Sequence, residues 1–134
     1  MFNGDGARLS EALTLAWSHV ASNLVVSRGS TQWGHGDTCA PHIPGVTVTC
    51  FDPTPATTQG EAEFAGRLAA RGHWRTIILV ATRPQATRAR LRMERCFQGR
   101  VYVAVAPLPR SQWPMAIVYE LGATVKAVVV QRGC

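Results

Sequence analysis

The sequence lacks the short patterns that mark the commonest catalytic and metal sites. It contains no Walker loop, no Gly-x-Ser-x-Gly elbow and no Cys-x-x-Cys pair. Its histidines match no metal-ligand spacing and lie where we expect helix ends or loops. We therefore expect no metal site, and P-loop, nucleophile-elbow and zinc chemistry are disfavoured. The four histidines are His19, His35, His42 and His73.

Lysine and acidic residues are scarce. Lys126 is the only lysine beside thirteen arginines, and eight acidic residues leave a net charge of +6. Arginine favours bidentate capture of carboxylate or phosphate. Like charges form no run, and aromatic and basic residues do not alternate, so we expect a small anionic partner and no nucleic acid.

Long hydrophobic runs are also missing. The apolar stretch near the C-terminus is interrupted by Glu120 and Lys126 well short of a membrane span, and no signal peptide is visible. We expect a soluble chain with no transmembrane segment. With 134 residues, 46% of them apolar, we expect residues 1–134 to form one domain, long enough to bury a single core.

The four cysteines allow three disulfide pairings. We favour Cys39–Cys50, which would staple a long loop to its strand, and Cys96–Cys134, which would tie down the last helix. Free buried thiols are the alternative. Native bridges would indicate an extracytoplasmic location.

Helical and strand patterns alternate along the chain. This order predicts an α/β fold with a mostly parallel sheet, helices on both faces and strand 76–82 at its centre. Gly4-Asp5-Gly6 reads as a turn after a strand, for which only Met1 and Phe2 remain, so the first strand is either truncated or a stub. The expected helices are 7–21, 58–72, 85–97 and 111–125, and the expected strands are 23–27, 46–51, 76–82 and 100–105.

A candidate site lies where strand 76–82 leads into helix 85–97. This strand-to-helix junction should bring hydroxyl, guanidinium and free backbone N–H groups to the carboxyl edge of the sheet, where open α/β folds bind ligands. Arg88 is the main candidate for ligand contact, whereas we interpret Arg92 and Arg95 as solvated. Thr58 and Glu61 match a capping box, and their helix should also begin at this edge.

These pieces, in this order, resemble the YdcF/SanA/ElyC family, also called domain of unknown function 218, and in particular an arginine-rich, actinobacterial-like branch. The family block Val-Thr-Ser-x-x-His-x-x-Arg-Ala is similar to Val80–Ala89, with Thr82 at the serine position and Gln85 at the histidine position. Outside this block, Gly4, Gly6, Arg8, Ser27, Gly29, Thr58 and Glu61 resemble other family positions.

The resemblance implies a Rossmann-like three-layer fold, a role in cell-envelope biogenesis and possible binding of S-adenosylmethionine. Many relatives carry a membrane anchor, so the chain would be extracytoplasmic or anchored if an upstream anchor is missing. Since glutamine cannot shuttle a proton as histidine does, catalysis stays open. The expected ligand-binding residues are Gly4, Asp5, Gly6, Arg8, Ser27, Gly29, Thr58, Glu61, Thr82, Gln85 and Arg88.

We therefore expect a domain that binds a small anionic or nucleotide-like ligand. Two alternatives remain at this point. One is a non-catalytic binding or regulatory domain in which Gln85 marks lost chemistry. The other is a hydrolase or transferase acting on phosphate esters or a lipid-linked phosphate, which needs a base that the sequence does not show.

Overall fold

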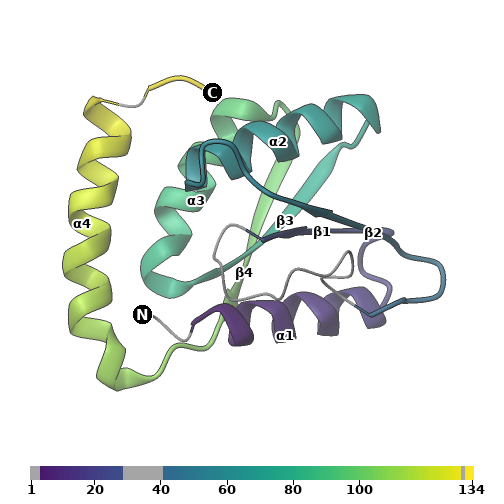
Figure 1. The fold of residues 1–134 in the computed structure, drawn as a ribbon, viewed down its shortest axis with the longest axis horizontal. Helices are drawn as coiled ribbons and strands as arrows, with labels where there is room; N and C mark the ends of the chain where they lie inside the picture. Colours follow the sequence, from purple (N-terminus) through teal and green to yellow (C-terminus); the bar gives the residue numbers. More distant parts are fainter. Residues whose placement is uncertain (1–3, 29–40, 131) are drawn as a thin grey trace.

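The computed structural model describes residues 4–28, 41–130 and 132–134, and it has an α/β fold (Figure 1). The alternation of helices and strands follows the order expected from the sequence. The elements are α1 (Gly4–Trp17), β1 (Asn23–Ser27), β2 (Thr47–Phe51), α2 (Thr58–Arg71), β3 (Thr76–Thr82), α3 (Arg83–Cys96), β4 (Arg100–Ala106), the short 3₁₀ helix η1 (Arg110–Gln112) and α4 (Trp113–Val129).

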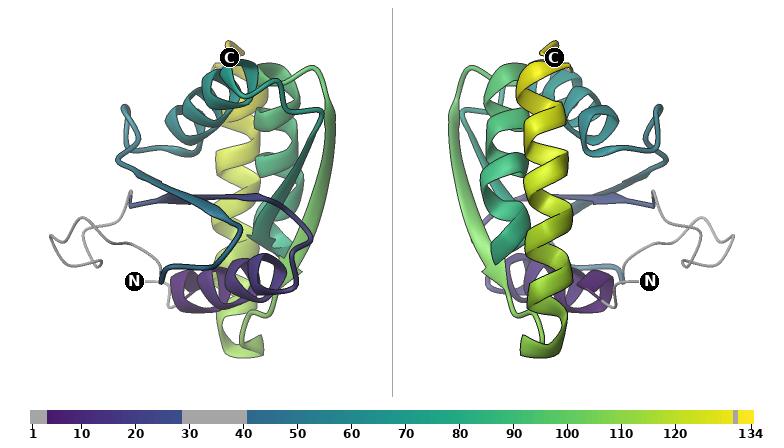
Figure 2. Two further views of the ribbon diagram at one scale, coloured as in Figure 1. Left: turned by 90° about the vertical axis from the view of Figure 1, so that its right-hand side faces the viewer. Right: turned by 90° about the vertical axis from the view of Figure 1, so that its left-hand side faces the viewer.

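The strands form two parallel pairs in place of the single sheet that we expected. β1 pairs with β2, with Asn23 opposite Thr47, and β3 pairs with β4, with Thr76 opposite Arg100. The two pairs run in clearly different directions (Figures 1 and 2). Neighbouring strands of one sheet differ by only about 20–25°, which explains why β1 and β3 do not share a ladder. Strand β3 is therefore not a central strand among the described residues.

Each strand pair has its own hydrophobic core. Helix α1 packs on the β1–β2 pair, where Ala16, Leu24, Ile43 and Val46 are buried together. Helices α2 and α3 pack on the β3–β4 pair around Ala69, Met93, Phe97 and Val101. Helix α1 also contacts β3 and β4, so it bridges the two halves.

Helices α1 and α2 are each followed, two residues after their last residue, by a histidine with left-handed backbone. His19 and His73 each have φ of 52°. The next residue, Val20 or Trp74, donates its N–H to the carbonyl five residues earlier, which is the Schellman arrangement. Helix α1 therefore ends at Trp17, earlier than expected. It also begins earlier, so Gly4-Asp5-Gly6 forms its first turn and not a separate glycine turn.

The start of α2 differs by one residue from the expected capping box. Thr57, not Thr58, is the N-cap, and its hydroxyl accepts a hydrogen bond from the N–H of Gly60 at 3.3 Å. A Cβ on Gly60 would collide with the carbonyl oxygen of Pro55. This close approach of the preceding turn fixes where the helix begins, and it leaves the Thr58 hydroxyl for another contact.

Helix α4 packs mainly against α3 and stands at one side of the molecule (Figure 1). A disulfide joins Cys96 at the end of α3 to Cys134, with Cα atoms 4.9 Å apart, a normal separation. The other expected bridge involves Cys39, which lies outside the described residues. No helix within the described ranges is both long and apolar enough to cross a membrane.

Candidate functional site

Polar side chains from five elements meet beside the amino end of α3. Arg8 comes from α1, Thr58 from α2, Thr82 ends β3, and Gln85 and Arg88 come from α3. All five belong to the residues that the sequence singled out. A sixth, Glu120 of α4, was not among them, yet it accepts two short hydrogen bonds from Arg88.

Arg88 and Glu120 form a buried, two-pronged ion pair. The guanidinium donates from Nε to Oε2 at 2.7 Å and from Nη2 to Oε1 at 2.8 Å, and the side chains are only 13% and 7% exposed. The remaining Nη1 donates to the Thr58 hydroxyl at 2.7 Å. This fork geometry is the strongest form of carboxylate recognition, and it commits Arg88 to a partner within the chain.

Arg8 lies on the other side of the same cluster. Its Nη1 donates to Oε1 of Gln85 at 3.3 Å, and the Thr82 hydroxyl donates to the same oxygen at 3.0 Å. Thr82 is the N-cap residue of α3, but its side chain makes no capping hydrogen bond to the helix backbone. Gln85 therefore links the end of β3 to α1.

The electrostatic surroundings of the two arginines are opposite. The hydrogen bond to Glu120 raises the pKa of Arg88 above its usual value. Burial lowers the pKa of Arg8, the neighbouring charge of Arg88 lowers it further, and the carboxylates of Glu61 and Glu120 offset this only in part. The protein thus stabilises the charge of Arg88 and disfavours that of Arg8.

A small hollow of about 60 Å³ lies between Arg8 and α4. A space of this size holds about two water molecules, or the anionic head of a larger ligand. Its walls combine the polar groups of the β3–α3 junction with residues that follow β4. The lining residues are Arg8, Thr82, Gln85, Leu108, Ala116, Tyr119 and Glu120.

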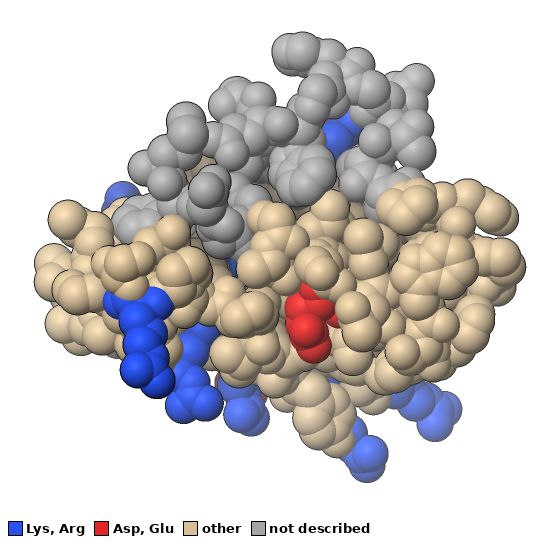
Figure 3. Space-filling view, turned by 90° about the horizontal axis from the view of Figure 1, so that it is seen from below, with Lys and Arg blue, Asp and Glu red and all other residues tan. Residues whose placement is uncertain are grey.

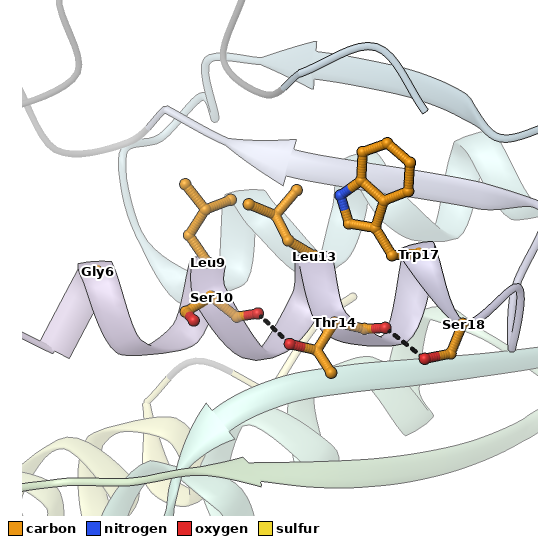
Figure 4. Close-up of a pocket in the computed structure, with 7 residues that line it drawn as sticks. All are labelled: Gly6, Leu9, Ser10, Leu13, Thr14, Trp17 and Ser18. Atoms are coloured by element: carbon orange, nitrogen blue, oxygen red, sulfur yellow. Dashed lines mark hydrogen bonds between the residues drawn. The ribbon is translucent and has the colours of Figure 1, made fainter. Parts of the chain in front are cut away.

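A larger hollow of about 550 Å³ runs along α1, away from this cluster. Its walls come from one helix, with Leu9, Leu13 and Trp17 along one side (Figure 4). The hydroxyls of Thr14 and Ser18 are bonded to carbonyls of the helix itself. Among the described residues that line it none is charged, whereas Arg8 and Glu120 line the smaller hollow.

The other expected site residues lie in α1, β1 and α2 or outside the described residues. Gly6 lies in the first turn of α1, where a Cβ would meet nothing within 4 Å. Gly4 and Asp5 precede it in that turn. Ser27 ends β1 in the other strand pair, opposite Phe51. Glu61 acts on both arginines through its charge, and Gly29 lies outside the described residues.

Two further arginines of α3 are not the solvated residues that we expected. Arg92 is only 4% exposed, and burial lowers its pKa, with the charges of Arg95 and Arg88 adding to the effect. Arg95 donates from Nη1 to the carbonyl of Ala127 at 3.0 Å. Because α4 covers this face of α3, a helical face rich in arginine is turned inward.

The sequence contained a signal for Glu120 that we did not interpret. An acidic residue in the middle of an otherwise apolar helix needs either solvent or a cationic partner. We treated Glu120 only as an interruption of an apolar stretch. Its partner Arg88 is 32 residues away in the sequence, so no local pattern identifies the pair.

Charged side chains also lie on the surface outside this cluster. On the face seen from below, basic side chains are spread out and do not form one continuous band (Figure 3). Within the described ranges, no three His, Cys, Asp or Glu residues are grouped so that they could hold a metal ion.

Comparisons with known proteins add no family to this description. No family model matches the chain, and no curated protein or solved structure is significantly similar to it.

Proposed function

We propose that this chain is a YdcF-like domain that binds a small anion, such as the phosphate of a nucleotide-like ligand, in the hollow beside Arg8. The observation that supports this most is the lining of that hollow, where the Arg8 guanidinium lies beside the Thr82 hydroxyl and the Gln85 amide. A half-buried guanidinium whose pKa is lowered still carries its charge at neutral pH. An anion placed beside it would offset the cost of that burial.

The polar groups around the hollow can form hydrogen bonds with an anion. Thr82 and Gln85 bring a hydroxyl and an amide to the wall of the hollow, and both can bond to an anion or its ester oxygens. Helix α3 begins at Arg83, so the positive end of its dipole lies close by. Since the hollow is small, the rest of a nucleotide or S-adenosylmethionine would lie outside it.

Binding without turnover is the favoured form of this proposal. Gln85 holds the position at which the resembled family has histidine, and its Oε1 accepts hydrogen bonds from Thr82 and Arg8. Glutamine exchanges no proton in the neutral pH range. The hydrolase or transferase alternative needs a proton acceptor at that place. The Rossmann-like arrangement and the envelope role follow from the resemblance and belong to this proposal.

Phosphate titration of Arg8→Ala tests the binding site. Calorimetry with inorganic phosphate should show binding to the natural chain and at least about tenfold weaker binding to the variant, because a charge-assisted hydrogen bond is lost. Arg90→Ala is the matched control, since Arg90 lies on the exposed side of α3 in an ion pair with Glu94. Equal losses in both variants would show a nonspecific charge effect.

Gln85→His separates binding from lost catalysis. Hydrolysis of a generic phosphate ester by this variant, with none by the natural chain, would favour a degenerate enzyme. Unchanged phosphate affinity without turnover would favour a binding domain. Phosphate affinity that is the same in the natural chain and in Arg8→Ala would refute the site.

A further inference from the structure

Helix α4 exposes its apolar side chains and buries an acidic one, the reverse of a normal surface helix. The helix is almost entirely apolar, yet its two buried residues are Glu120 and Ala127. Apart from Trp113, its large apolar side chains face outward, with exposed fractions between 44% and 67%. A surface helix ordinarily buries its apolar stripe and exposes its charges.

The contacts that hold α4 to the body are partly polar. Glu120 pairs with Arg88, the carbonyl of Ala127 accepts from Arg95, and the disulfide to Cys96 holds the segment that follows the helix. Polar anchors of this kind orient the helix without using its apolar surface. The outward face in the right-hand view of Figure 2 has no described element in front of it.

The outward apolar residues follow a 3-4 spacing. Met115, Val118, Gly122, Val125 and Val129 are separated by 3, 4, 3 and 4 residues, and we call them the α4 seam. This is the repeat with which one helix packs against another in a two-stranded coiled coil. Leu121 and Val128 flank the seam and are also exposed.

The seam is uncharged, and it has a point of close approach. Lys126 is the only exposed charged residue of α4, and it lies beside the seam and not within it. A Cβ on Gly122 would meet nothing within 4 Å. A second helix can therefore approach the backbone most closely at the middle of the seam.

We propose that the α4 seam is the interface of a homodimer, with α4 of a second copy as its occupant. The exposed apolar residues of α4 and Val130 offer on the order of 1,000 Å² per chain, and a standard interface takes about 800 Å² from each partner. Monomers seldom expose more than a few hundred Å² of contiguous apolar surface. A self-complementary stripe packs against its own copy in a twofold dimer without a charge to bury.

The test is the mass of the oxidised chain in solution. Sedimentation equilibrium at about 1–100 μM should give twice the chain mass of 14.5 kDa. Val118→Glu combined with Val125→Glu should raise the dimer dissociation constant at least about hundredfold, since each places a charge in the seam. Val20→Glu is the matched control: Val20 is 55% exposed beyond the end of α1, and this variant should remain a dimer. Circular dichroism verifies that each variant is folded.

A second variant tests the seam without disturbing the fold. Gly122→Cys should yield a covalent dimer on a non-reducing gel after mild oxidation, whereas Val20→Cys should not. A natural chain that is monomeric throughout the concentration range overturns the proposal. If that monomer sediments with phospholipid vesicles, the seam faces a lipid surface instead. A dimer that survives the double substitution and gives no cross-link at position 122 places the interface elsewhere.

Discussion

The two ends of the candidate site use the same residue type in opposite ways. Arg88 is held by two oxygens of Glu120 and the hydroxyl of Thr58, and its pKa is raised. Arg8 contacts the amide oxygen of Gln85, and burial lowers its pKa. The first end is a structural ion pair, and the second is where we propose that an anion binds. Family motif positions alone do not separate these roles.

The difference changes the role that we assign to Arg88. From the sequence we expected it to contact a ligand, and in the structure each of its three nitrogens already donates one hydrogen bond to Glu120 or Thr58. A ligand that took both oxygen-binding prongs of the guanidinium would have to displace a buried carboxylate. Arg8 lies beside the hollow and is the better candidate for recognition. Substitutions of Arg88 and of Arg8 should therefore differ most in their effect on the free energy of unfolding.

The largest expected effect is that of Arg88→Ala. Removing one partner of a buried pair leaves the charge of Glu120 without compensation and typically costs about 3–5 kcal/mol. Urea unfolding should show this loss in the free energy of unfolding. Since Arg88 has a raised pKa, its contribution is present at every pH below the unfolded-state pKa and is lost only as the pH rises through the folded-state pKa. The loss should therefore be the same throughout the neutral range.

A double variant separates the cost of an unpaired charge from the net value of the pair. Arg88→Met with Glu120→Leu removes both charges and fills similar volume, so it should recover most of the stability that Arg88→Ala loses. If both variants unfold equally easily, packing of the arginine stem, and not its charge, would account for the loss.

Thr58→Val should have the next largest effect. The substitution removes the oxygen that accepts from Nη1 of Arg88 while keeping the shape of the side chain. The buried Nη1 donor of Arg88 then has lost this acceptor, which costs about 1–3 kcal/mol of stability. Urea unfolding of this variant in the Arg88→Ala background provides the control, because there the second substitution should cost much less.

Thr57→Ala should lower stability by less than Thr58→Val, because it removes only a helix cap of α2. Its hydroxyl caps the N–H of Gly60, and loss of such a cap costs about 1 kcal/mol. The midpoint of thermal unfolding should fall by a few degrees, and phosphate affinity should not change. If Thr58→Val costs as much stability as Thr57→Ala, and each loss simply adds to that of Arg88→Ala, then Thr58 is not coupled to the ion pair.

The sequence predicted the local parts of this fold better than their assembly. Strand β3 and the start of β4 lie where their apolar patterns place them, since pattern and burial agree there. Among the described residues the strands do not form the single sheet that we expected, because the pairing of β1 with β3 depends on relative strand direction, which no local pattern encodes. The position of the N-cap among two adjacent threonines depends on the turn at Pro55 packed on Gly60.

The candidate site shows the same limit. Thr82 and Gln85 are three residues apart and their contact follows from the strand-to-helix junction, so the sequence could locate them together. Arg8 and Gln85 are 77 residues apart, and only the family resemblance grouped them. Glu120 was missed because its pairing with Arg88 depends on which face of α4 meets α3.

Arg8→Ala should have the smallest effect on stability and the largest on binding. The substitution removes a cation whose burial is unfavourable, and the hydrogen bond of Arg8 to Gln85 is long, so we expect the free energy of unfolding without phosphate to change by less than about 1 kcal/mol. Because the native-state pKa of Arg8 is lowered, its charge costs stability at every pH below that pKa, and the cost is relieved only as the pH rises through it. The small difference from the natural chain should therefore not vary near neutral pH. Phosphate at about 100 times its dissociation constant should stabilise the natural chain by about 2.7 kcal/mol, and much less of this should remain in the variant. A large loss of stability without phosphate would instead make Arg8 a structural residue like Arg88, and the contrast between the two ends of the site would disappear.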